Sequence, residues 1–244
     1  FRWNTTLTWS KNDNKILSLA EGADENQVIS TVGTASIIGR VGGTTGDLWG
    51  YKLVRDPEGN VVIGDNGLPE QADEIEYVGT AYADWKAGWY NEFSYKGFKL
   101  GILLDGQVGG TIYSMSFHKM MEQGKLTQSL NGRLPGTEYY MDASDPRIAA
   151  AGYTPQSGMY MIAPGVVRND DGTFSPNTKV VTIESFYKEY YRRANVETNS
   201  FDASFLKIRE IRLEYELPKK VLEKSWKRLG KETLPRTAAL EKAQ

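Results

Sequence analysis

Two long alternating segments between residues 85 and 108 constrain the fold of this chain more than any other feature. Side chains of a β-strand point to opposite faces in turn, so every second residue shares a face. In the first segment one parity is polar or small, and the other is mostly aromatic or apolar and comprises Trp85, Ala87, Trp89, Asn91, Phe93 and Tyr95. The segment therefore predicts a strand with one apolar face.

The second segment repeats the pattern after Lys96–Gly97, a pair suited to a two-residue hairpin turn because glycine tolerates positive φ. Its apolar parity comprises Phe98, Leu100, Ile102, Leu104 and Val108. Across such a turn Tyr95 pairs with Phe98, and paired residues share a face. We therefore expect an antiparallel hairpin with all of these side chains on one surface.

Two further segments alternate in the same way. Phe1 to Trp9 is one, and Phe205 to Leu217 is the other. In the latter, Ile211, Leu213, Tyr215 and Leu217 alternate with Glu210, Arg212, Glu214 and Glu216. Ordinary strands have about 5 or 6 residues, whereas a tilted strand needs about 9 to 11 to cross a bilayer. The hairpin strands reach that length, but alternation alone does not separate a membrane barrel from a soluble sandwich.

Composition excludes several functional classes. The 244 residues carry 29 Lys+Arg against 31 Asp+Glu, so the chain lacks the strongly basic balance typical of nucleic-acid binding. It has no Cys and one His, which removes thiolate and His-cluster metal sites. With a mean hydropathy of -0.48 and no apolar run near about 18 residues, a helical membrane protein is also excluded. A membrane β-barrel stays open, because its strands need only alternate.

No catalytic, metal or cofactor motif emerges. His118 has no triad around it and sits among Met and Phe residues, so we interpret it as a packing or loop histidine. Asp170-Asp171-Gly172 lacks the spaced ligands of a calcium loop and predicts a β-turn. Gly106, Gly109 and Gly110 lack the Lys-Ser/Thr of a phosphate loop, and they predict close packing or a bend near a strand end. We expect no enzyme activity.

Long turn-rich segments separate the alternating ones. Residues 55–72 are expected to form tight turns on a β-ribbon, and residues 113–178 a long loop with a short helix over 115–123. A helical turn or two is expected over 185–193. Loop aromatics such as Tyr139, Tyr140 and Tyr160 could stack on a glycan, although packing is the favoured interpretation.

Three strings in this chain resemble a known family. "VGTAYADWKAGWYNEFSYKGFKLGILLDGQVGGTIYS" (78–114) is similar to the late-barrel hairpin of the SusC/RagA family of TonB-linked outer-membrane transporters. "FDASFLKIREIRLEYELPKKVL" (201–222) resembles a later strand of that family, and "GDLWGYKL" (46–53) is a weaker match. Their order and spacing suit the region from Ser36 to Leu222.

The resemblance implies an all-β fold of antiparallel strands in a transmembrane β-barrel, with long extracellular loops. The family's barrel has about 22 strands and is occluded by an N-terminal plug. It implies as partners TonB, acting through the missing N-terminal part, a SusD-like surface lipoprotein and outer-membrane lipid. This chain departs from the family pattern: it has no plug-like region and too few strands to close so wide a barrel. We expect residues 1–222 to be a late barrel portion and residues 223–244 a truncated or unrelated tail.

In such a wall the two faces have different surroundings. The residues expected to face the lumen are Glu92, Lys99, Asp105, Gln107, Glu210, Arg212, Glu214 and Glu216. Those expected to face lipid or its interface are Trp85, Trp89, Phe93, Tyr95, Phe98, Leu100, Ile102, Leu104, Ile211, Leu213 and Tyr215. Wall-to-wall or wall-to-plug ion pairs are the favoured interpretation of the charged set.

The predicted function is thus part of the wall of an importer of oligosaccharides or peptides in the outer membrane of a Gram-negative bacterium. One alternative is a secreted or surface β-sandwich that binds glycans through aromatic loops. A glycoside hydrolase ranks last, because it needs two facing carboxylates about 5 to 10 Å apart and no motif nominates them.

Overall fold

The computed structural model describes residues 1–222, and the predicted tail over 223–244 lies outside the described residues. The chain forms two compact units. The first contains residues 1–11, 85–108 and the segment that begins at Phe205. The second contains residues 12–84 and 109–204.

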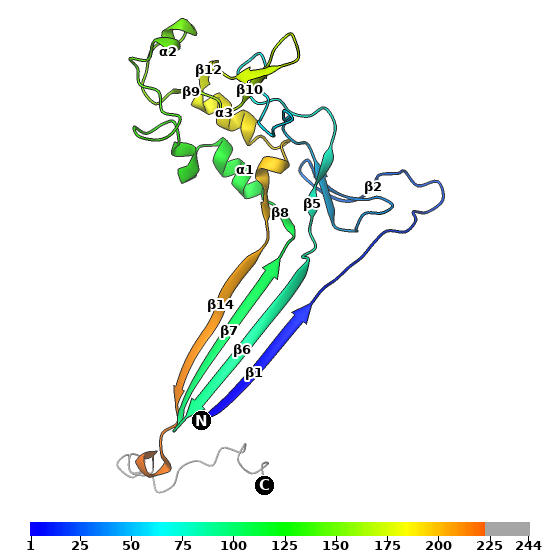
Figure 1. Ribbon diagram of the computed structural model, residues 1–244, viewed down its shortest axis with the longest axis vertical. Helices are drawn as coiled ribbons and strands as arrows, with labels where there is room; N and C mark the ends of the chain where they lie inside the picture. The colour runs from blue at the N-terminus through cyan, green and yellow to red at the C-terminus, as the bar shows by residue number, and fades with distance from the viewer. Residues whose placement is uncertain (223–244) are drawn as a thin grey trace. The chain divides into compact units, whose positions relative to one another are not determined.

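The first unit is built on one four-stranded antiparallel sheet with the strand order β1-β6-β7-β14 (Figure 1). Its strands are β1 (Arg2–Ser10), β6 (Trp85–Tyr95), β7 (Phe98–Val108) and β14 (Phe205–Tyr215). The predicted hairpin is confirmed, since Tyr95 pairs with Phe98 and Trp85 with Val108. The predicted first strand is confirmed as well.

The turn between β6 and β7 consists of Lys96 and Gly97, whose backbone conformation is unusual. Lys96 and Gly97 both have positive φ, 45° and 87°, as a two-residue turn matched to the strand twist requires. The opposite end of the sheet carries the long connections, residues 12–84 from β1 to β6 and residues 109–204 from β7 to β14. One short turn therefore lies at one end of the strands and two long segments lie at the other.

The second unit has short elements around its own buried side chains. One sheet has the order β2-β3-β4-β5, and three strand pairs are β8–β13, β9–β12 and β10–β11. The strands are β2 (Gln27–Val32), β3 (Ala35–Gly39), β4 (Asp47–Gly50), β5 (Glu76–Thr80), β8 (Thr111–Tyr113), β9 (Tyr160–Ile162), β10 (Val166–Arg168), β11 (Phe174–Pro176), β12 (Val180–Thr182) and β13 (Ser200–Asp202). The helices are α1 (Met115–Glu122), α2 (Pro146–Ala150) and α3 (Ile183–Tyr190), with 3-10 turns η1 (Thr127–Leu130) and η2 (Glu197–Asn199).

The segment expected to be a long loop is thus more ordered than the sequence indicates. The largest core cluster of the second unit includes Met121 from α1 and Met161 from β9, both within that segment, and Ile183 from α3, all with no exposed surface. The predicted short helix is confirmed as α1, whose N-terminus is capped by the Ser114 hydroxyl. The later helix begins earlier than predicted, because Thr182 accepts a hydrogen bond from the Ser185 amide and sets its start.

The fold is therefore all-β in its main elements, with antiparallel sheets and few helices. No sheet formed by residues 1–222 closes on itself. None of the helices in this part of the chain has the length and apolar character needed to span a membrane.

Candidate functional site

The candidate site is the four-stranded sheet of the first unit, which has two chemically different faces. Residues paired directly across antiparallel strands share a face, so the registers define each face. The apolar face carries Trp3, Leu7, Trp9, Trp85, Trp89, Phe93, Tyr95, Phe98, Leu100, Ile102, Leu104, Leu206, Ile208, Ile211, Leu213 and Tyr215. All residues predicted to face lipid or its interface are among them.

Much of this apolar face is uncovered. Leu7 and Leu213 are 71% and 72% exposed, and Trp89 is 45% exposed. A monomeric soluble protein rarely leaves a continuous apolar surface of this kind open to water. No second sheet within residues 1–222 covers these side chains, as a sandwich core would require.

A β-bulge in β14 keeps the face continuous. The register changes between Ile208, which pairs with Leu104, and Glu210, which pairs with Leu103. Arg209 is the extra residue, so even-numbered apolar residues before it and odd-numbered ones after it lie on the same side. The sequence prediction missed this bulge, although Leu206 and Ile208 already break the parity of Ile211 and Leu213. The strand also ends at Tyr215 and not at Leu217, which corrects the predicted boundary.

Two of the indole N–H groups on the apolar face are hydrogen-bonded within the sheet. The Trp3 indole Nε1 donates to Asn91 Oδ1 at 3.1 Å, and the Trp89 indole Nε1 donates to Thr5 Oγ1 at 2.9 Å. Asn91 is only 6% exposed. Trp89, which was expected to face lipid or its interface, lies in the interior of β6 and not at a strand end. Its indole N–H is nevertheless satisfied without water.

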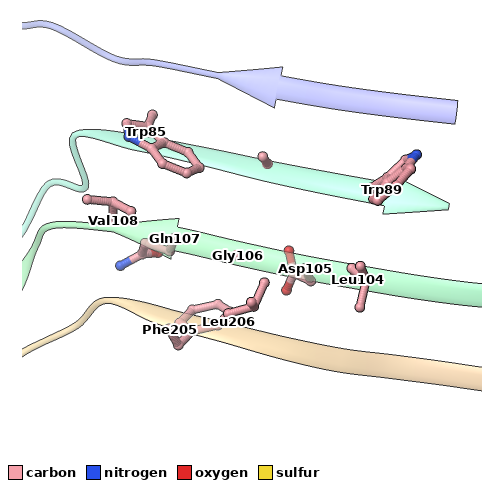
Figure 2. Close-up of a pocket in the computed structure, with 10 residues that line it drawn as sticks. Trp85, Trp89, Leu104, Asp105, Gly106, Gln107, Val108, Phe205 and Leu206 are labelled. Carbon is pink, nitrogen blue, oxygen red and sulfur yellow. The ribbon is translucent and has the colours of Figure 1, made fainter.

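A shallow apolar groove of about 300 Å³ runs over this face near the start of β6. Figure 2 shows Trp85 and Trp89 projecting from β6, with Leu104 on β7 and Leu206 on β14 beside them. The groove exists because Ala87 and Gly106, two of the smallest residues, are paired in register between the larger side chains. Gly106, where close packing or a bend was predicted, lies within β7, and the site of a Cβ added there would lie 3.4 Å from the Phe205 carbonyl oxygen.

The opposite face carries nearly all residues predicted to face a lumen. Glu92, Lys99, Asp105, Gln107, Glu210, Arg212 and Glu214 lie on it by register. Glu216 follows the end of β14, where its amide donates to the Gly97 carbonyl oxygen at 2.7 Å. It therefore lies outside the ladder of paired residues in which it was predicted.

Arg212 is the centre of a charged cluster on this polar face. Its NH2 group lies 3.1 Å from Glu92 Oε2 and 3.0 Å from the Tyr90 hydroxyl. Its Nε lies 3.2 Å from Glu214 Oε1 and 3.8 Å from Glu210 Oε1. The Tyr90 hydroxyl donates to Glu92 Oε2 at 3.1 Å, and Asn4 reaches Glu92 Oε1 at 3.3 Å. Four of the charged residues predicted to form ion pairs, Arg212, Glu92, Glu210 and Glu214, therefore pair with one another within the sheet.

A second ion pair joins adjacent strands. Arg209, the bulge residue of β14, places NH2 and Nε 2.7 and 2.8 Å from Asp105 Oδ2 on β7. The bulge thus contributes a cation to the polar face while it realigns the apolar one. Among the residues that the structure describes, no cluster of His, Asp or Glu suits a metal ion.

In the second unit the structural interpretations of His118, of residues 170–172 and of the glycines are confirmed. His118 is buried, and its Nδ1 donates to the Tyr191 carbonyl oxygen at 2.6 Å, so it is a packing histidine. The predicted turn at Asp170–Gly172 is confirmed by the Gly172 amide, which donates to the Asn169 carbonyl oxygen. Gly109 and Gly110 have positive φ and form the predicted bend.

The favoured interpretation of Tyr160, packing, is confirmed, but its expected place in a loop is wrong. Tyr160 lies in β9, is 8% exposed, and donates its hydroxyl to the Thr154 carbonyl oxygen. Tyr139 and Tyr140 are half-buried. Burial, together with the neighbouring Tyr190 and Tyr187, raises the pKa of Tyr191 to about 12, which is typical of a packed phenol. Tyr139, Tyr160 and Tyr191 thus belong to the core clusters of the unit or pack against them.

No protein-family model matches the chain, and no curated protein matches it. What the chain does is therefore inferred from its own residues and their geometry.

Proposed function

We propose that this chain is a late part of the barrel wall of a TonB-linked outer-membrane importer, which takes up oligosaccharides or peptides with a SusD-like surface lipoprotein. The observation that carries the proposal is the two-faced sheet: an uncovered apolar face lies back to back with a hydrogen-bonded charged face. A strand in a membrane barrel has this pattern, since lipid-facing and lumen-facing residues alternate. The resemblance of residues 78–114 and 201–222 to the SusC/RagA family points to the same class.

The strand lengths support a membrane location. An 11-residue strand such as β6 is about 37 Å long, which projects to about 28 Å along the membrane normal at a tilt of about 40°. The apolar band of outer-membrane barrels is about 25 Å tall and is flanked by aromatic girdles. Tyr95, Phe98 and Tyr215 form one row at the turn end of the sheet, and Trp9 and Trp85 lie near the other end.

The connectivity supports the same assignment. Outer-membrane barrels have short turns on the periplasmic side and long loops outside the cell. Here Lys96–Gly97 closes one end, whereas residues 12–84 and 109–204 connect strands at the other. In this proposal the second unit is built from extracellular loops, and the turn faces the periplasm.

In this proposal the wall acts as a scaffold. Every wall strand pairs with neighbours, because unpaired backbone groups are costly in hydrocarbon. The apolar face contacts outer-membrane lipid, and the polar face contacts the plug or the water-filled path. TonB acts on the plug and not on this portion. A β-sandwich that binds glycans is less well supported, because Leu7, Trp89 and Leu213 have no opposing layer in the part of the chain described.

Two consecutive residues of β7 provide a test. Ile102 lies on the apolar face and Leu103 on the polar face, near the middle of the strand. In the full-length importer of which this chain is the proposed part, reconstituted into lipid vesicles, Ile102→Arg should lower the free energy of unfolding by about 2–4 kcal/mol, because the charge enters hydrocarbon. Leu103→Arg should change it much less. Equal effects of the two substitutions, measured by urea unfolding, would refute a lipid-facing apolar surface.

A further inference from the structure

Arg212 joins two strands that are not neighbours. It lies on β14, whereas its partners Tyr90 and Glu92 lie on β6, and β7 runs between them. Strands two apart are separated by about 10 Å, a distance that two long side chains can bridge only by leaning toward each other. The Tyr90 hydroxyl and the Arg212 guanidinium do so, since they meet at 3.0 Å.

Gly101 on β7 makes room for this bridge. It pairs with Glu92 on one side and with Arg212 on the other, so it occupies the middle of the row. A Cβ added at Gly101 would lie 3.2 Å from the Tyr90 hydroxyl and 3.5 Å from Arg212 Nε. A longer side chain would therefore enter the space that the bridge fills. Glycine inside a strand commonly marks such a close approach or a bend.

The two faces differ in bulk around this point. The neighbours of Gly101 in β7 are Leu100 and Ile102, and both side chains project from the apolar face. On the polar side there is no side chain in the middle of the row, and the flanking strands are drawn together by charge-assisted hydrogen bonds. Contraction on one face and bulk on the other bend a sheet toward the contracted face.

We propose that Arg212 clamps β14 to β6 over Gly101 and thereby makes the polar face of the sheet concave. Arg209 serves a different purpose, because its partner Asp105 lies on the adjacent strand. This inference goes beyond the proposed function, since it concerns the shape of the sheet in whatever medium the chain folds. It explains how a sheet with this sequence could enclose its charged side, as closure of a barrel requires.

The absence of cysteine allows a direct test by dipolar electron paramagnetic resonance. Spin labels at Phe93→Cys and Leu213→Cys report on the apolar face beside the clamp, because both residues pair with Leu100. A concave polar face holds these outer labels apart. Arg212→Gln in the full chain in detergent micelles should flatten the sheet, bring the labels closer and increase the dipolar broadening.

The matched control is Arg209→Gln, which removes the same charge from the same strand and should leave the broadening unchanged. Gly101→Val keeps every charge and should reproduce the effect of Arg212→Gln. The double variant Tyr90→Phe with Glu92→Gln removes both partners on β6 and should increase the broadening as Arg212→Gln does, and it decides the matter if Arg212→Gln does not fold. Unchanged broadening in Arg212→Gln, an equal change in Arg209→Gln, or unchanged broadening in the double variant would each overturn the clamp. None of these outcomes bears on whether the apolar face contacts lipid, which the Ile102 and Leu103 pair tests separately.

Discussion

Asn91 is a polar residue in the middle of the apolar face, and its burial depends on Trp3. The Trp3 indole Nε1 donates to Asn91 Oδ1, so this buried amide oxygen has a partner from the neighbouring strand. A buried acceptor that loses its partner destabilises a fold by about 1–3 kcal/mol. The hydrogen bond thus allows an amide side chain to lie on a mostly apolar face.

Trp3→Phe should therefore lower the free energy of unfolding by about 1–3 kcal/mol, because it keeps an aromatic ring and removes the donor. Trp9→Phe is the matched control: Trp9 lies on the same strand and face, is 64% exposed and should change stability little. Denaturant titrations of both variants under one condition measure the difference. Equal losses would show that the indole ring and not its hydrogen bond matters.

Asp145 makes stability of the second unit depend on pH. Hydrogen bonds from the Arg147 side chain and amide lower the pKa of Asp145 to about 2, and the carboxylate also caps α2. In an unfolded chain the pKa is about 3.9. Because the folded pKa is depressed, the stabilisation is present above about pH 4 and is lost as the pH falls toward about 2.

Asp145→Asn can still cap the helix but carries no charge. The melting temperature of the variant should lie below that of the parent at pH 5, and the two should converge as the pH approaches about 2. Thermal melts followed by circular dichroism between pH 5 and 2 give the comparison. If the difference in melting temperature stayed constant over this pH range, its cause would be packing and not the charge of Asp145.

At the scale of elements, the bulge in β14 decides which side chains reach the apolar face. Removing Arg209 would restore strict alternation through the strand. Either Leu206 and Ile208 or Ile211 and Leu213 would then turn to the polar face.

Deletion of Arg209 should therefore destabilise the chain more than Arg209→Ala, which keeps the extra residue and loses only the ion pair with Asp105. Resistance to urea in lipid vesicles, measured on both variants, tests this order. If the deletion is as stable as the substitution, the register is not fixed by the bulge.

The elements themselves could be predicted to different degrees. The hairpin β6–β7 followed from alternation and from Lys96–Gly97, because both signals are local. The short strands β9 to β12 did not follow, because three residues carry too little periodicity to stand out. Met161 of β9 and Val181 of β12 pack in one cluster with Ile63 and Met121, which are far away in the chain.

At the scale of the whole molecule, two units with different surfaces share one chain. The second unit buries its apolar residues in three clusters, whereas the sheet of the first leaves its apolar face uncovered. Uncovered apolar surface of this extent favours association in water. The medium should therefore affect the first unit far more than the second.

The full chain should be poorly soluble in plain buffer and become monodisperse in detergent micelles, as size-exclusion chromatography with light scattering would show. In detergent, the second-unit variant Met161→Ala should have a free energy of unfolding about 2–5 kcal/mol lower than that of the parent. In plain buffer it should be as poorly soluble as the parent. A soluble monomer with a cooperative melt in plain buffer would contradict the proposed membrane wall.

The sequence by itself determined the strands of the sheet, their turn and the separation of charged from apolar side chains onto two faces. All of these depend on the period-two geometry of a strand and on local turn residues. Only the tertiary structure decided the bulge at Arg209, the meeting of Arg212 with Glu92 and Tyr90, and the burial of Tyr160. Each of these depends on segments that are distant in the chain. Their contacts are set by register and packing, which a linear pattern does not contain.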